Sequence, residues 1–262
     1  MRVLTVLLWC LTAFAQQTAA PANDAQANQQ KARHLLDQMI TALGGQAYLT
    51  VEDSHIEGRT GVFYHGSSEG GDVFVRFWQW PGKERWEHTK QRDIITLYVD
   101  DKAYERTFRG TRQLNPDKDA DLRRFMLRRK YTLEIVLRQW LSAPGTALFY
   151  EGPALTENHS VERVTVINNN DEAVTLLIDA DSHLPVKKIF ISRDPQTRDR
   201  DEIGEVYDNW KKVQGVTTPY NTLITFNGDL FRQYFITSVS YNSHLQPVLF
   251  DPGAMNYDSR KK

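Results

Sequence analysis

The chain has 262 residues, a length that allows one large all-β domain or two smaller domains. Hydrophobic residues make up 40% and charged residues 25%, which is the composition of a globular protein rather than a disordered one. The formal net charge of -1 provides no general attraction to nucleic acid, so we expect no nucleic-acid partner.

The N-terminus has the pattern of a secretory signal peptide. Arg2 precedes an apolar run over residues 3–14, which is too short to span a bilayer comfortably. Because Ala13 and Ala15 form an A-x-A cleavage site, we expect a signal peptide of residues 1–15; a retained anchor is the alternative. The only cysteine, Cys10, lacks the preceding small residues of a lipoprotein signal, so we expect no lipidation and no disulfide.

Residues 16–30 are rich in Ala and Gln and predict a flexible leader. Apolar residues at helical spacing then predict a helix over residues 31–43, which Gly44 and Gly45 would end. The apolar stripe consists of Leu35, Leu36, Met39, Ile40 and Leu43. This stripe is expected to pack on a sheet.

From residue 54 onward, period-two and β-branched runs predict two series of strands, separated by a helical insert over residues 117–141. The strands are predicted at 55–64, 72–80, 83–89, 93–99, 103–108, 160–167, 173–179, 184–192, 203–210, 215–226 and 230–241, with a short extended stretch at 147–150. Residues 130–132 are expected to break the insert into two helices.

About eleven strands in one antiparallel sheet will curl towards closure, because twisted sheets of that size rarely stay open and flat. The predicted fold class is therefore mainly β (α+β): a curled antiparallel sheet that forms a half-open barrel. The N-terminal helix and the helical insert would serve as its lid. We expect one domain over residues 31–252, followed by a polar tail over residues 253–262.

No catalytic motif stands out. The seven histidines show no metal-ligand spacing, and the chain lacks the G-x-S-x-G, phosphate-loop and dinucleotide-binding patterns. We therefore predict a protein that is not an enzyme, with no metal site and no cofactor. Alternating acidic and arginine residues at 198–205 predict a solvated hairpin with cross-strand ion pairs.

Aromatic residues are the more suggestive feature. Phe74, Trp78 and Trp80 share one face of their predicted strand, and Trp86 and Trp140 add further bulk. In a curled sheet, these five residues are candidates for the lining of an apolar cavity that binds an acyl chain. A plainly packed core is the alternative.

Arg124 and Arg128 lie one helical turn apart in the insert and share one helix face. They are candidates for contact with anionic lipid head groups or with an acidic partner. An ordinary solvated helix face is the alternative.

The sequence also resembles a known family. The relevant residues are the helix ending at Leu43-Gly44-Gly45, the hairpin at residues 176–188 (LLID to LPVKK) and the strand at residues 205–210 (EVYDNW). With the layout of helix, strands, insert and strands, roughly residues 32–250 resemble the LolA/LolB-like periplasmic lipoprotein carrier superfamily. The resemblance is strongest to outer-membrane lipoprotein-sorting proteins.

This resemblance implies a periplasmic carrier, and we expect it to be a monomer. Such a protein would hold a lipid or the acyl chains of a lipoprotein in an apolar cavity during transport towards the outer membrane. Envelope membrane proteins are a second class of expected partner. The alternative is an envelope protein-interaction or sensor module whose concave face is filled by its own side chains.

Overall fold

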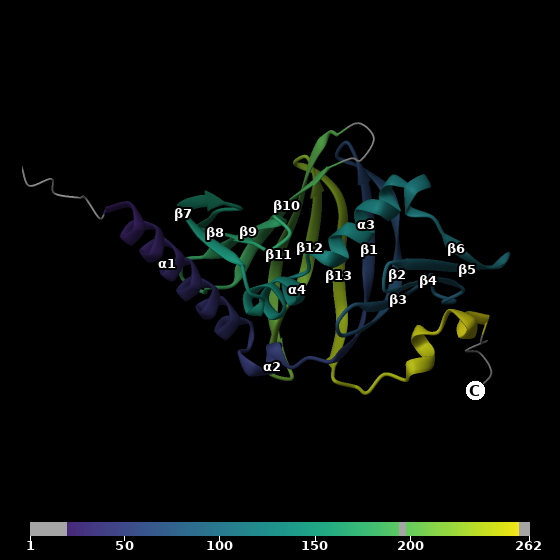
Figure 1. Ribbon diagram of the computed structural model, residues 1–262. Coiled ribbons are helices and arrows are strands. Elements are labelled where there is room, and N and C mark those ends of the chain that lie inside the picture. Colours follow the sequence, from purple (N-terminus) through teal and green to yellow (C-terminus); the bar gives the residue numbers. More distant parts are fainter. Residues whose placement is uncertain (1–19, 194–197, 257–262) are drawn as a thin grey trace, which may run out of the picture.

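The computed structural model describes residues 20–193 and 198–256, so the predicted signal peptide lies outside the described residues. The described strands form one strongly curled antiparallel sheet, and helices cover part of its concave side (Figure 1). The helices are α1 (Ala20–Leu43), α2 (Gln46–Leu49), η1 (Pro116–Lys118), α3 (Ala120–Lys130), α4 (Leu133–Arg138), η2 (Trp140–Ser142), η3 (Pro247–Phe250) and η4 (Pro252–Asn256). The strands are β1 (Asp53–Tyr64), β2 (Ser67–Gln79), β3 (Lys83–His88), β4 (Ile94–Val99), β5 (Lys102–Thr107), β6 (Gly110–Leu114), β7 (Ala147–Thr156), β8 (His159–Ile167), β9 (Ala173–Asp179), β10 (Pro185–Arg193), β11 (Arg200–Val213), β12 (Val216–Phe226) and β13 (Asp229–Tyr241).

The sheet consists of two meanders joined at their ends. Its strand order is β6-β5-β4-β3-β2-β1-β13-β12-β11-β10-β9-β8-β7, so each half pairs strands that are neighbours in sequence. The halves meet where β1 pairs with β13, from Ser54 opposite Tyr241 to Val62 opposite Arg232. The predicted class, a mainly β half-open barrel with helices at its mouth, is confirmed.

The number of strands in the described sheet is thirteen rather than about eleven. Strand β6 was not predicted, because its sequence GTRQL has no alternation of apolar and polar residues and most of it is exposed. The stretch predicted at residues 147–150 continues as strand β7 to Thr156. Backbone pairing with a neighbouring strand is sufficient to extend an edge of the sheet without an apolar face.

Helix α1 begins at Ala20 rather than at Lys31, so the predicted flexible leader of residues 16–30 is helical from Ala20 onward. Ala and Gln have high helix propensity, and in this segment they favour a helix over the flexible chain that their low hydrophobicity predicted. The predicted stripe is buried except for Ile40, which is partly buried: Leu36 and Met39 have no exposed surface, and Leu43 has almost none. Gly44 ends the helix with φ +126°, and a Cβ atom there would lie 2.4 Å from the Gly215 carbonyl oxygen.

Asn28 on α1 protects the edge strand β7. Its Oδ1 accepts a hydrogen bond from Tyr150 N at 2.9 Å, and its Nδ2 donates to Tyr150 O at 2.7 Å. The amide thus pairs with the backbone as a neighbouring strand would, which matters at an otherwise open edge. We expect Asn28→Ala to lower the free energy of unfolding by about 1–2 kcal/mol in urea denaturation. Gln29→Ala, an exposed neighbour on the same helix, should change it by less than about 0.5 kcal/mol; equal effects would contradict this role.

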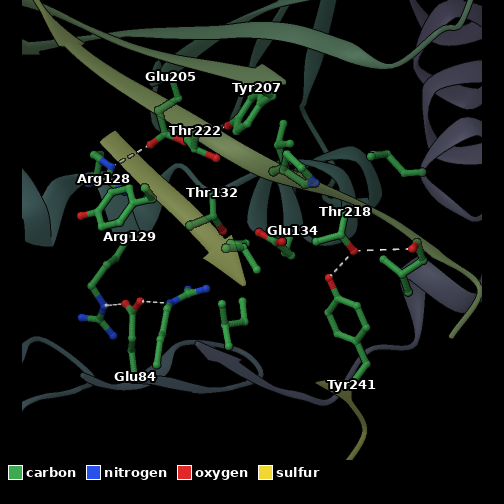
Figure 2. A pocket seen from close by; sticks show the side chains of 18 of the residues that line it. Glu84, Arg128, Arg129, Thr132, Glu134, Glu205, Tyr207, Thr218, Thr222 and Tyr241 are labelled. Atoms are coloured by element: carbon green, nitrogen blue, oxygen red, sulfur yellow. Dashed lines mark hydrogen bonds and ion pairs between the residues drawn. The ribbon is translucent and has the colours of Figure 1, made fainter. Parts of the chain in front are cut away.

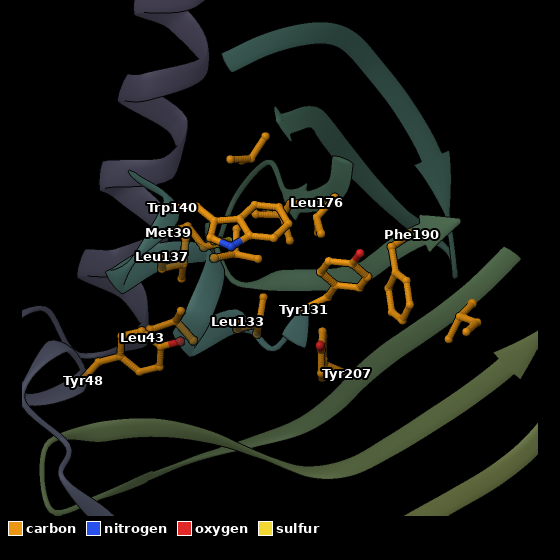
Figure 3. Packing of buried hydrophobic residues seen from close by; sticks show 14 of the residues in the cluster. Met39, Leu43, Tyr48, Tyr131, Leu133, Leu137, Trp140, Leu176, Phe190 and Tyr207 are labelled. Carbon is orange, nitrogen blue, oxygen red and sulfur yellow. The ribbon is translucent and has the colours of Figure 1, made fainter. Parts of the chain in front are cut away.

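The helical insert is broken where the sequence predicted. Helix α3 ends at Lys130, and Thr132 caps α4 by accepting a hydrogen bond from Ile135 N at 3.3 Å. Tyr131 lies in the turn between the two helices, and Leu133 is the first residue of α4. Both side chains are buried against the concave face of the sheet. Figure 3 shows this cluster, in which the labelled side chains are Met39, Leu43, Tyr48, Tyr131, Leu133, Leu137, Trp140, Leu176, Phe190 and Tyr207. The insert and α1 therefore share one core with the second half of the sheet.

The C-terminal segment is packed as far as it is described, so the predicted tail over residues 253–262 begins too early. Met255 is fully buried with Phe250 against Ile95 and Leu97, which lie on the convex face of the first half. The Asp53 carboxylate holds the start of this segment by accepting hydrogen bonds from backbone N–H groups at 2.7 and 3.2 Å. Within the described ranges, no helix has the length and apolar character needed to span a membrane.

Candidate ligand-binding cavities

Alternate residues of each strand form the concave face. On β3, Glu84 and Trp86 point inward, whereas Arg85 points to the convex side and donates a hydrogen bond to Leu249 O. Helices α3 and α4 cross the concave face without filling it. Two cavities lie between these helices and the sheet, with volumes of about 200 and 260 Å³.

The smaller cavity, which we call the Tyr241 cavity, lies near α4 and the ends of β12 and β13 (Figure 2). Leu43, Ile56 and Val216 contribute apolar walls. Its polar groups include the hydroxyls of Thr218 and Tyr241, whose oxygens are 2.7 Å apart. The lining also includes six charged residues, Arg76, Glu84, Arg128, Arg129, Glu134 and Glu205. The cavity therefore combines an apolar wall with neutral and charged hydrogen-bonding groups.

The larger cavity, which we call the Arg232 cavity, lies beside the N-terminal half of α3. Its apolar lining comes from both halves of the sheet and from the helix: Leu114, Leu122, Ile203, Ile224, Phe226 and Phe231. Arg232 and Thr60 lie in its wall on neighbouring strands of the junction between the halves. This cavity is thus built at the point where the two meanders meet.

A cluster of aromatic side chains separates the two cavities. The aromatic residues that line both are Phe74, Trp86, Phe125 and Tyr234, and we call them the aromatic waist. Arg128 also lines both cavities. The ring of Trp86 lies 5.0 Å from that of Phe74, 5.6 Å from Tyr234 and 6.2 Å from Phe125. Phe125 and Arg128 belong to α3, so the position of this helix determines whether the cavities are divided.

Glu205 on β11 is the centre of a buried ionic cluster under α3. Its carboxylate accepts from Arg128 Nε at 2.8 Å, from Lys188 Nζ at 3.0 Å and from the Tyr207 hydroxyl at 2.8 Å. Lys188 is completely buried and also donates to Tyr131 O at 2.6 Å. Burial acts to raise the pKa of Glu205, but the two cations outweigh that effect and lower it to about 2.

A second ionic cluster joins α3 to the other half of the sheet. Glu84 on β3 accepts from Arg76 Nε at 2.5 Å, from Arg129 Nε at 3.1 Å and from Trp86 Nε1 at 2.9 Å. Burial opposes ionisation of Glu84, but the two guanidinium groups prevail and lower its pKa. Successive residues of α3, Arg128 and Arg129, therefore hold the helix to β11 and β3 respectively (Figure 2).

Of the five aromatic residues predicted to line a cavity, two line the central cavities and three lie elsewhere in the structure. Phe74 and Trp86 line both cavities. Trp78 is buried beside Trp80, with ring centroids 6.1 Å apart, and Trp140 lies in the core beneath α1. The lining of the two central cavities does not include Trp78, Trp80 or Trp140. Ligand contact by any of the five residues stays a prediction.

The two arginines of the insert do share one face, and that face lies against the sheet. Arg124 pairs with Asp121 at 2.7 Å and its guanidinium lies 4.3 Å from the ring of Phe226. Arg128 points inward to Glu205, and both arginines line the Arg232 cavity. Their contact with lipid head groups or with a partner stays a prediction.

Sequence reasoning missed the buried carboxylates. Residues 198–200 of the predicted solvated hairpin are exposed, but Glu205 is only 7% exposed. Ile203, Glu205 and Tyr207 lie at alternate positions on one face of β11. An acidic residue between two apolar residues at this spacing is the sequence signal that could have indicated a buried carboxylate. Glu84 has the same signal, because it alternates with Trp86 on β3.

Comparison with known proteins gives matches by structure alone. No protein-family model and no curated protein matches the sequence. A DUF1329 family protein from Desulfovibrio piger has a TM-score of 0.57 at 11% identity over 85% of this chain and 98% of its own. The putative outer membrane lipoprotein-sorting protein domain from Vibrio parahaemolyticus has a TM-score of 0.56 at 10% identity, covering 86% and 98% of the two chains.

A LolA superfamily protein from Nitrosomonas europaea is also similar, with a TM-score of 0.54 at 8% identity over 84% of this chain and 97% of its own. These matches and the geometry above define a class of protein: a half-open antiparallel barrel whose concave face is covered by helices. The particular fold is LolA-like, as the sequence resemblance implied. At these identities the comparisons establish the fold alone.

Proposed function

We propose that this chain is a binding protein rather than an enzyme. It would sequester the acyl chains of a lipid or lipoprotein on the concave face of its barrel. The observation that carries this proposal is the pair of cavities between the sheet and α3, lined by aromatic and aliphatic side chains. The LolA-like fold supports it, because two of the similar structures are described as a lipoprotein-sorting protein domain and a LolA superfamily protein.

The physical basis is apolar burial. Each CH₂ group removed from water contributes about 0.8 kcal/mol, so an acyl chain needs few polar contacts to bind. Each cavity is smaller than a typical ligand site of roughly 300–1,000 Å³, but their combined volume falls within that range. Displacement of Phe125 with α3 would join them into one continuous site. Cavities of this size favour the carrier over a module whose concave face is filled.

We further propose that the protein acts in the periplasm and delivers its cargo towards the outer membrane. The predicted signal peptide of residues 1–15 supports export. Envelope membrane proteins would be the partners that load and unload the carrier. Arg124 and Arg128 of α3 line the Arg232 cavity and are the candidate contacts for a head group or for such a partner.

A direct test uses the purified mature protein. Organic extraction followed by mass spectrometry should recover a co-purified amphiphile, and phenylnaphthylamine, a neutral apolar fluorophore, should brighten and be displaced by dodecanol. Recovery of no amphiphile, together with no binding of the fluorophore, would rule the carrier function out.

Variants that fill the cavities make the test specific. Thr222 lines the Tyr241 cavity and Thr96 the Arg232 cavity. We expect Thr222→Phe and Thr96→Phe each to weaken dodecanol binding by about tenfold or more, which corresponds to excluding roughly two CH₂ groups. Leu223→Phe is the matched control, because Leu223 neighbours Thr222 on β12 and lines neither cavity. Equal affinities in all three variants would place the ligand elsewhere.

A further inference from the structure

Arg232 lines its cavity with a buried guanidinium nitrogen that lacks a partner among the described residues. The Nε atom of Arg232 is buried and has no hydrogen-bond partner, and no ion pair joins this guanidinium to another residue of the described ranges. Its Cζ atom lies 5.4 Å from the ring of Phe231. A buried donor of a charged group without an acceptor is costly, so such a group points to an acceptor that binds there.

The register of the strands places further polar groups beside Arg232. Thr60 is paired with Tyr234 across the β1–β13 ladder, so Thr60, Arg232 and Tyr234 share the concave face. The Thr60 hydroxyl is likewise buried without a hydrogen-bond partner. His88 on β3 lines the same cavity. Burial lowers the pKa of His88, and the charge of Arg232 adds to this effect, which Asp72 and Glu105 oppose.

The carboxylates of this cavity already have partners of their own. Glu105 accepts two hydrogen bonds from Arg112, at 2.9 and 2.7 Å. Asp121 pairs with Arg124 at 2.7 Å, and Asp119 caps α3 by accepting from Leu122 N at 3.0 Å. Arg232 is therefore the charged group of this cavity whose pairing is incomplete.

From this geometry we propose that the Arg232 cavity binds the anionic head group of a single-chain amphiphile, a carboxylate or a phosphate monoester. Arg232 and Thr60 donate hydrogen bonds to its oxygens, and the acyl chain lies along Ile203, Ile224 and Phe226. An arginine guanidinium suits both head groups, because its fork of N–H donors matches two oxygens of either. This inference rests on the proposed function and specifies its cargo.

The test compares dodecanoate, dodecyl phosphate and dodecanol as competitors of phenylnaphthylamine at neutral pH. We expect at least one of the two anions to bind at least tenfold more tightly than dodecanol, and the preferred anion identifies the head group. Arg232→Met should abolish this preference and leave dodecanol binding unchanged. Arg33→Met, which removes an arginine that pairs with Asp37 and lines neither cavity, should keep the preference.

The outcomes separate the two proposals. If dodecanol binds as tightly as both anions, or if Arg232→Met retains the preference, the head-group site is wrong while the carrier function stands. If none of the three amphiphiles binds, the carrier function itself fails. Should Arg232→Met not fold, Thr60→Val takes its place, and an unchanged preference for the anion in that variant counts against the site.

Discussion

Glu205→Gln should lower the free energy of unfolding by about 3–5 kcal/mol, because it leaves Arg128 and Lys188 buried without their counter-charge. The measurement is chemical denaturation at neutral pH. Asp37→Asn is the matched control, since it breaks the exposed Arg33–Asp37 pair and should cost no more than about 0.5 kcal/mol. Similar losses in both variants would mean that the Glu205 cluster does not contribute as a buried network.

The pH dependence provides an independent check on the same residue. The pKa of Glu205 is lowered from its usual 4.5 to about 2, so its stabilisation is complete above pH 4.5 and is lost as the pH falls towards 2. That loss corresponds to about 3 kcal/mol. The wild type should therefore lose more stability than Glu205→Gln over this interval. Asp179, whose pKa is also about 2, contributes equally to both curves and cancels in the difference. Parallel curves of unfolding free energy against pH for the wild type and Glu205→Gln would contradict the assignment of this pH dependence to Glu205.

Trp86→Ala should lower the free energy of unfolding by about 3–5 kcal/mol, because it removes the side chain at the centre of the aromatic waist. Trp86 is 8% exposed, contacts the rings of Phe74 and Tyr234, and donates a hydrogen bond to Glu84. Denaturation followed by far-UV circular dichroism avoids relying on the fluorescence of the residue that is changed.

Two further variants test how much of this loss of stability comes from the hydrogen bond to Glu84 and how much from burial of the ring. Trp86→Phe keeps most of the packing but removes the donor to Glu84, so we expect a loss of about 1–2 kcal/mol. Phe108→Ala changes an aromatic residue that is 91% exposed and should stay within about 0.5 kcal/mol of the wild type. If Trp86→Ala behaves like Phe108→Ala, the waist does not support the fold.

Strand positions could be predicted where apolar side chains alternate or run together. Residues 173–179 were predicted as a strand with the bounds that β9 has, and the break of the insert at residues 130–132 was also correct. Strand β6 could not be predicted, because its pairing with β5 depends on backbone groups and its side chains are polar. The start of α1 was missed because helix propensity and low hydrophobicity predict opposite states for residues 20–30.

The site was predictable only in its apolar part. Phe74 could be identified on the aromatic face of its strand, and Trp86 as a bulky residue of the next strand. The roles of Glu205 and Arg232 could not, because whether a charge is buried depends on partners far away in sequence. Arg128, the partner of Glu205, lies 77 positions before it. Thr60 and Arg232 come to share the concave face only when β1 and β13 are paired.

The ladder between β1 and β13 has a consequence for how the chain folds. Every other ladder of the described sheet joins strands that are consecutive in sequence, and these hairpins can form from local contacts. The β1–β13 ladder instead closes a loop that contains almost the whole domain, and the entropic cost of closing a loop rises with its length. Its formation is therefore the step of highest contact order, and the Arg232 cavity can exist only after that step is complete.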